Sequence, residues 1–300
     1  MPSKKLKDTK PYNILFPHKT ITDWDHLVKF YNQKREEWSG WIFRGHRDSE
    51  WSLTTTIERL AIEQWSRTYD ELPTIEAGLI RSFRRHFHHY SQFIPNEDDN
   101  IQWLSIMQHY GTITRLLDCT YSFYAALFFA LGETTPIQKP DNMSAIWAFD
   151  AEWLYNGLKD KLNNEEKNEY GYIDFKDVVT DPKRDNYFLF QRDQAIPSVC
   201  TVNPFKLNER LIIQQGVFLS PGDIKKSFID NLVAVTENRS PKKHLYLILL
   251  PNSSDFLKVT IRELNRMNMN SATLFPGLDG FARHLNSGLI VPKLIKVGKK

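Results

Sequence analysis

The sequence predicts an α+β fold with a helical N-terminal part, a small mixed or antiparallel sheet and one buried central helix. Apolar residues at helical spacing dominate the first part of the chain, as in the run from Leu72 to Ser91. Short apolar runs typical of strands gather in the second part, as at Leu245 to Leu250. Because helices and strands do not alternate regularly, a doubly wound parallel sheet is disfavoured.

The expected helices share an apolar residue at every third or fourth position, and they cover residues 24–31, 56–65, 72–91, 103–110, 122–132, 254–269 and the end of 273–284. The expected strands share short apolar runs, and they cover residues 41–45, 51–53, 114–119, 144–149, 199–202, 212–219 and 245–250. The segment 122–132 is almost entirely apolar, so we expect this helix to be buried on all sides.

A chain of 300 residues is long enough for one large domain with a substantial core. We assign residues 1–20 to an N-terminal arm, residues 21–290 to the domain and residues 291–300 to a basic tail. Residues 156–190 are polar and charged, and we interpret them as a surface insertion within the domain.

Composition limits the compartment and the partners. The net charge of +3 argues against a protein coated in nucleic acid, although it leaves local basic patches open. The two cysteines do not make a disulfide framework, and no apolar run reaches the roughly 18 residues of a membrane span. No histidine–cysteine spacing indicates zinc. We therefore expect a cytoplasmic protein with no membrane partner and no metal.

The first candidate motif is Phe43-Arg44-Gly45, at the end of an expected strand. A strand-end arginine presents a planar fork of five donors that suits a phosphate or a carboxylate. The glycine permits close approach of a ligand or of another backbone. The alternative is a structural role, in which Arg44 pairs with a carboxylate such as Asp48 or with backbone carbonyl groups.

The second motif runs from Gln108 to Thr120 and packs polar groups between apolar ones. Arg115 and Asp118 cannot both be buried without partners, so we expect a partly buried Arg115–Asp118 pair that shapes a pocket wall. The alternative is an internal network that holds a turn, with His109 as a structural histidine.

The third motif, Gln214-Gln215-Gly216, lies within an expected strand. A glycine inside a strand marks a bulge or a close backbone approach. The two amides can read a nucleobase or a ribose, or they can simply cap the sheet.

Together these motifs resemble the FRG domain family, which is named for a Phe/Tyr-Arg-Gly motif. The resemblance covers roughly residues 25–285 and rests on segments that occur in order: Phe43-Arg44-Gly45 with Asp48, Trp51 and Leu53; Gln108 to Gly111, Thr114 to Asp118, Thr120 and Ala125 to Ala130; Asn208, Arg210 and Gln214 to Phe218; and Ala272 to Gly280. Cys119 departs from the family pattern, which has an aromatic residue there.

The family is similar to ADP-ribosyltransferases in its layout, and its members resemble parts of bacterial antiphage or toxin systems. The resemblance implies an effector with an ADP-ribosyltransferase-like fold that uses NAD to modify a nucleic acid, a nucleotide or a protein. An antitoxin or a phage protein would be its partner. The implied catalytic residues are Arg44, Asp118 and Gln215. The implied NAD-binding residues are Arg44, Gly45, His109, Thr114, Arg115, Thr120 and Gln214.

A second hypothesis is a non-catalytic sensor for a nucleotide or a phage component. It arises because the late strand carries no obvious carboxylate for catalysis. Glu209 is present, but it precedes the two amides. In both hypotheses we expect three neighbouring strands, spaced by about 4.8 Å, to bring Arg44, Asp118 and Gln214 into one cleft.

Overall fold

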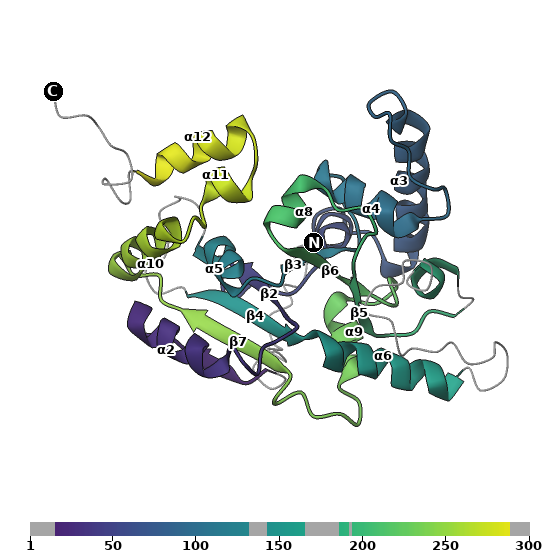
Figure 1. Cartoon of the computed structure of the whole chain (residues 1–300). Coiled ribbons are helices and arrows are strands. Elements are labelled where there is room, and N and C mark those ends of the chain that lie inside the picture. The colour runs from purple at the N-terminus through teal and green to yellow at the C-terminus, as the bar shows by residue number, and fades with distance from the viewer. Residues whose placement is uncertain (1–15, 132–142, 166–185, 192–193, 289–300) are drawn as a thin grey trace, which may run out of the picture.

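The structure is a computed structural model that describes residues 16–131, 143–165, 186–191 and 194–288. Its centre is a seven-stranded mixed sheet with the order β1-β7-β4-β2-β3-β6-β5 (Figure 1). The strands are β1 (His18–Thr20), β2 (Trp41–His46), β3 (Leu117–Thr120), β4 (Ser144–Asp150), β5 (Val199–Val202), β6 (Gly216–Pro221) and β7 (Leu245–Leu250). The pair β1–β7 is parallel, and the other neighbours are antiparallel.

The helices cover both faces of this sheet. They are α2 (Trp24–Lys34), η1 (Glu58–Gln64), η2 (Tyr69–Glu71), α3 (Leu72–Phe87), α4 (Asn100–His109), α5 (Phe123–Leu131), α6 (Ala151–Glu165), η4 (Tyr187–Gln191), α8 (Glu209–Ile213), α9 (Phe228–Val235), α10 (Ser254–Arg266), α11 (Ser271–Leu274) and α12 (Leu278–Ser287). Figure 1 shows α2, α5 and α10 around one half of the sheet and α3, α4 and α8 around the other.

The sheet separates two apolar layers. Ile42 and Trp147 lie on one face and belong to the same cluster as Leu232 of α9. Phe43 lies on the other face and packs with Ala126 of α5, in a cluster that also includes α2 and α10. A third cluster lies between α4, α8 and the second face of β5 and β6. The middle strands are therefore buried from both sides.

Gly45 permits the closest approach between β2 and α5. A Cβ atom on Gly45 would lie 2.1 Å from the carbonyl oxygen of Ala126 and 2.4 Å from the backbone nitrogen of Ala130. Both distances are too short for any side chain, so the position requires glycine. The sequence allowed two roles for this glycine, and the structure shows the approach of another backbone. It gives no support for a contact between Gly45 and a cofactor.

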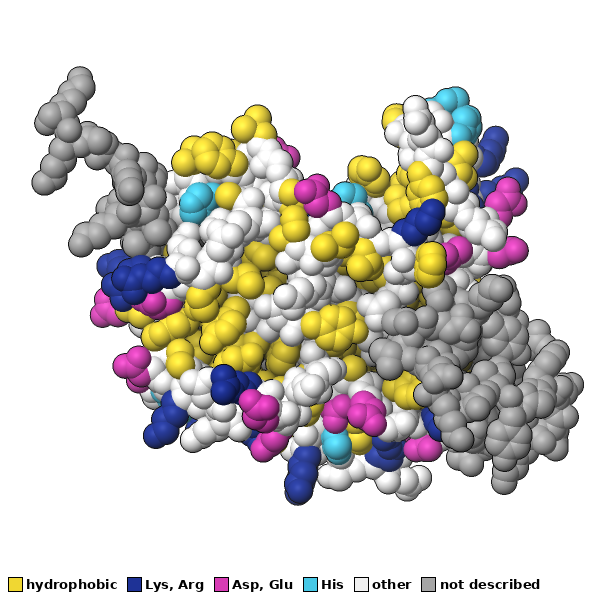
Figure 2. Space-filling model, viewed as in Figure 1, with side chains coloured by type: hydrophobic (Ala, Val, Ile, Leu, Met, Phe, Trp, Pro, Cys, Tyr) yellow, Lys and Arg dark blue, Asp and Glu magenta, His cyan; other side chains and the backbone are white. Residues whose placement is uncertain are grey.

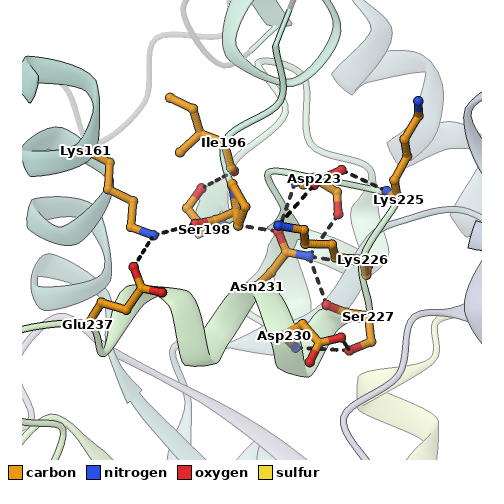
Figure 3. Close-up of polar contacts among 11 residues, drawn as sticks. Lys161, Ile196, Ser198, Asp223, Lys225, Lys226, Ser227, Asp230, Asn231 and Glu237 are labelled. Atoms are coloured by element: carbon orange, nitrogen blue, oxygen red, sulfur yellow. Dashed lines mark hydrogen bonds and ion pairs between the residues drawn. The ribbon is translucent and has the colours of Figure 1, made fainter. Parts of the chain in front are cut away.

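The edge formed by β5 and β6 is held by a buried asparagine of α9. The Oδ1 atom of Asn231 accepts hydrogen bonds from the backbone N–H groups of Ser198 (3.2 Å) and Asp223 (2.9 Å). Its Nδ2 atom donates to the carbonyl oxygens of Asp223 (2.8 Å) and Ser227 (2.9 Å). Figure 3 shows how the loops before β5 and after β6 converge on this side chain. The amide therefore satisfies backbone groups that would otherwise be buried without partners.

Most expected elements are confirmed, including the buried central helix α5, and the α+β class holds. Some expectations differ from the structure. Residues 51–53 form no strand. Within residues 1–20, Phe16 is buried and His18–Thr20 form β1, which pairs with β7. Residues 156–165 belong to α6, and Leu158 and Phe188 enter the core, so the ends of the expected surface insertion are packed. Residues 166–185 lie outside the described ranges.

Gly45→Ala tests the contact between β2 and α5. The added methyl group has no room against the α5 backbone, so we expect loss of cooperative folding, measured by thermal unfolding. Gly78→Ala is the matched control, because nothing lies within 4 Å of a Cβ there and the residue is inside α3. Alanine at an exposed helix position should raise stability by about 0.5–1 kcal/mol. Similar melting temperatures for both variants would contradict the role assigned to Gly45.

Candidate functional site

The register of the sheet places Arg44 and Asp118 on opposite faces. Phe43 lies opposite Thr120, and Arg44 lies opposite Trp147 on the next strand. Asp118 lies opposite Phe218 of β6, on the face that α4 and α8 cover. The strands that carry the three motifs are neighbours, as expected. However, side chains alternate along each strand, so the Arg44 side chain and the Asp118 carboxylate do not share one cleft.

Arg44 makes internal hydrogen bonds. Its Nε donates to Nε2 of His46 (3.0 Å), and its Nη1 donates to the carbonyl oxygen of Asp118 (2.5 Å). Burial lowers the pKa of Arg44. Its contact with a backbone carbonyl matches the structural alternative.

The hydrogen bond between Arg44 and Asp118 lies between two strands that share few residue pairs. The strands β2 and β3 share one residue pair, Phe43 with Thr120, whereas β3 and β6 share four. The carbonyl of Asp118, just beyond the shared pair, accepts from the guanidinium. Because this hydrogen bond runs from β2 to β3, the side chain of Arg44 helps to join the two halves of the sheet.

Cys119 shares the face of Arg44. Burial raises the pKa of its thiol to about 12, although the charge of Arg44 opposes this shift. The side chain belongs to the same apolar cluster as Trp147. The small residue at this position is therefore part of the core.

Arg115 pairs with Glu76 of α3, so the expected Arg115–Asp118 pair is wrong. Its Nε donates to both carboxylate oxygens of Glu76 at 2.8 and 2.9 Å, and its Nη1 donates to the carbonyl of Leu189 (3.2 Å). The side chains of Arg115 and Glu76 are 5% and 3% exposed. Arg115 precedes β3 in a bend, which directs its side chain away from Asp118 and toward α3. The sequence held a signal for Glu76, because its spacing from Leu72 places it on the buried face of a helix.

The two threonines of the second motif have structural roles. The hydroxyl of Thr114 donates to Oε1 of Gln108 (2.5 Å). The hydroxyl of Thr120 donates to the carbonyl of Gln214 (2.6 Å) and accepts from the backbone N–H of Ser122 (2.9 Å). Both residues are buried, so these bonds satisfy the hydroxyl groups within the protein.

Gln214 and Gln215 lie outside the strand that we expected to carry them. The side chain of Asn208 accepts from the backbone N–H of Leu211 (2.9 Å) and begins the short helix α8, of which Gln214 is the C-cap. The Nε2 of Gln214 donates to the carbonyl of Leu274 (2.8 Å). Gln215 is exposed, with a φ of 48°, and β6 begins only at Gly216. An N-cap asparagine ahead of a short apolar run is therefore the signal that sequence reasoning missed.

A polar pocket of about 170 Å³, named here the motif pocket, lies between α4, β3 and α8. Its polar lining includes Gln108, His109, Asp118, Asn208, Arg210 and Gln214. The carboxylate of Asp118 is exposed, and one of its oxygens accepts from Nε2 of Gln108 (3.0 Å). Burial and the charge of Arg210 lower the pKa of His109, which favours the neutral imidazole. The pocket thus combines a carboxylate, a guanidinium, a neutral imidazole and amides.

The motif pocket brings together His109, Asp118 and Gln214 of the expected site. Arg210, which the sequence showed only as part of the resemblance, joins them and lies over the ring of Phe275 at 4.9 Å. The other expected residues, Arg44, Gly45, Thr114, Arg115, Thr120 and Gln215, do not line this pocket.

The family model of the FRG domain matches residues 39–139, so this segment is similar to the FRG domain family. This segment contains the first two motifs and ends before the third. No curated protein and no solved structure matches the chain. Within the described ranges, none of the helices has the length and apolarity that a membrane span requires. In the same residues, no group of three or more His, Cys, Asp or Glu is placed to hold a metal ion.

Glu76→Ala tests the buried ion pair. The substitution leaves the Arg115 charge buried without its carboxylate, so the free energy of unfolding should fall by about 3–5 kcal/mol in urea titration. Glu36→Ala is the control, because its pair with Arg35 is exposed and should contribute little. Replacing both partners, in Glu76→Leu/Arg115→Met, should recover most of the loss. A small effect of Glu76→Ala would contradict the assigned role.

His46 predicts a pH dependence of stability. Burial, and secondly the charge of Arg44, lower its pKa to about 3, whereas an unfolded histidine titrates near 6.5. Both ring nitrogens face N–H donors, from Arg44 and Trp147, and an imidazolium has no acceptor. The native state therefore binds fewer protons, and this contribution to stability is present above pH 6.5 and lost as the pH falls toward 3.

As the pH falls from 6.5 to 5, the free energy of unfolding should decrease in the wild type more steeply than in His46→Gln. We expect the two slopes to differ by about 1 kcal/mol per pH unit. Burial raises the pKa of Glu58, which acts with the opposite sign, but it does so in both proteins and cancels in the comparison. Urea titrations at several pH values provide the measurement. Parallel pH profiles for the two proteins would show that His46 titrates normally.

Proposed function

We propose that this protein recognises a nucleoside-containing ligand at the motif pocket and works as a nucleotide-binding module. The observation that carries this proposal is the exposed carboxylate of Asp118, which is oriented by Gln108 and shares a pocket with Arg210 and His109. The remaining oxygen of Asp118 makes no hydrogen bond within the described residues, so it is available to a ligand.

The donor set suits the parts of a nucleotide. A carboxylate accepts hydrogen bonds from the two hydroxyl groups of a ribose, and an arginine fork suits a phosphate. A neutral imidazole such as that of His109 can donate to or accept from the edge of a base. The volume of about 170 Å³ is below the usual range for whole small molecules, about 300–1,000 Å³, so the pocket fits one part of a nucleotide.

Three observations favour binding over transfer. The Nε and Nη1 donors of Arg44 are used inside the protein, on the face opposite the motif pocket. The amide nitrogen of Gln214 is engaged by Leu274. Among the described residues of β6, Gly216–Pro221, there is no carboxylate to stabilise the positive charge that develops when NAD loses nicotinamide.

An ADP-ribosyltransferase-like effector is the second candidate. It is supported by the neighbouring positions of β2, β3 and β6 in the sheet. NAD would be its substrate, with Asp118 near the reacting ribose. A nucleotide, a nucleic acid or a protein as acceptor, a role in antiphage defence and an antitoxin or phage partner rest on the family resemblance.

Asp118→Asn tests the proposed site. Loss of the charged acceptor should lower the affinity for NAD about tenfold, measured by isothermal titration calorimetry. Asp255→Asn, an exposed carboxylate at the start of α10, is the matched control and should bind as the wild type does. Assay of nicotinamide in the same samples separates the candidates: intact NAD supports a binding module, whereas steady nicotinamide release would establish the transferase class. Equal affinity of all three proteins for NAD would remove the motif pocket as the site.

A further inference from the structure

A second cavity adjoins the motif pocket and has a different chemistry. It encloses about 570 Å³ between α3 and the end of α4, and we name it the aromatic cavity. Its lining includes Phe83, Phe87, Tyr90 and Tyr110. Figure 2 shows hydrophobic side chains over α3 and a hollow between the projections formed by α3 and by α11 with α12.

The floor of the aromatic cavity consists of packed rings, and its rim is accessible. The rings of Phe83 and Phe87 stack at 5.5 Å, and Phe87 packs edge-on against the buried ring of Trp103 at 5.3 Å. By contrast, Tyr90 and Tyr110 are 84% and 71% exposed. Two accessible tyrosines beside a packed apolar floor form a surface on which a flat ring can stack.

The polar groups of the aromatic cavity are few and uncharged, apart from one histidine. Among the described residues, its lining contains no carboxylate, lysine or arginine. The Nδ1 atom of His86 lies 2.8 Å from the carbonyl oxygen of Ser82, which can only accept, so Nδ1 carries a proton. In the neutral ring Nε2 is then an acceptor, which suits the amino group of a base such as adenine.

The two pockets are neighbours in the fold and share a lining residue. Thr112 lines both of them, and the adjacent rings of His109 and Tyr110, 4.9 Å apart, place one residue in each pocket. The motif pocket alone is too small for a nucleotide, but together the two match a ligand with two ring systems. The polar part of such a ligand fits the motif pocket, and its second ring fits the aromatic cavity.

We propose that the ligand is a dinucleotide, two nucleosides joined through phosphate, with one nucleoside in the motif pocket and the other base stacked in the aromatic cavity. This inference rests on the proposed function and adds the ligand class and a second subsite. The same chemistry occurs in NAD, where a diphosphate joins the nucleosides, and in a step of single-stranded nucleic acid, where a phosphodiester does.

Tyr110→Ala tests the second subsite. Removal of the ring should lower the affinity for NAD, or for the two-nucleotide DNA d(ApA), about five- to a hundredfold, the usual effect of one base stacked on an aromatic residue. Tyr110→Phe keeps the ring and should bind as the wild type does. Trp65→Ala is the matched control, because Trp65 is 70% exposed and lines neither pocket. Titration calorimetry with both ligands shows which linkage the protein accepts.

Comparison with Asp118→Asn separates this inference from the proposed function. If each single variant loses affinity, and the two losses in binding free energy add in the double variant, both pockets are supported as the two ends of one ligand site. Loss of affinity in Asp118→Asn but not in Tyr110→Ala would overturn the second subsite and leave the motif pocket. Loss in Tyr110→Ala alone would overturn the proposed function. Failure of the wild type to bind either dinucleotide would overturn the inference.

Discussion

The backbone contact between β2 and α5 at Gly45 is the constraint on which the rest of the fold depends. The helix α5 follows β3 after a short turn, so its position over β2 determines where β3 can lie. With α5 fixed there, β3 meets β2 at one residue pair, and Arg44 donates a hydrogen bond to the carbonyl of Asp118, two residues before the paired Thr120. The motif pocket is lined by Asp118 of β3, so its geometry depends on where β3 lies. The backbone contact at Gly45, which fixes β3, contains no polar side chain.

Local features of the fold could be predicted from the sequence, whereas long-range pairings could not. The helix α2 begins where Asp23 caps it, and the apolar run of α5 is buried, because these signals lie within a few neighbouring residues. The partner of Arg115 lies on α3, 39 residues away. The spacing of Glu76 from Leu72 indicates that this carboxylate is buried, but no local pattern pairs it with Arg115. The faces of Arg44 and Asp118 depend on register, in which a shift of one residue reverses every side chain. The expectation of one cleft therefore failed although the strand neighbours were correct.

The polar residues of the three motifs divide into two groups. Arg44, Arg115, Thr114 and Thr120 satisfy backbone or buried carboxylate groups, so they hold β3 and the segment before it in place. Asp118 and His109 reach a pocket, together with Arg210. Most polar residues of these motifs thus stabilise the fold, and they position a smaller number of side chains that are accessible to a ligand. A variant of the first group that loses function should therefore be tested for folding before the loss is assigned to the pocket.

Cys119 has a consequence for the response of the protein to oxidants. Oxidation of cysteine proceeds through the thiolate, and a thiol with a pKa of about 12 is almost entirely protonated at neutral pH. The sulfur is also enclosed beside Arg44 in the middle of the sheet, where peroxide has little access. The centre of the fold, and the pockets built on it, should therefore keep their structure under oxidative stress that would modify an accessible cysteine.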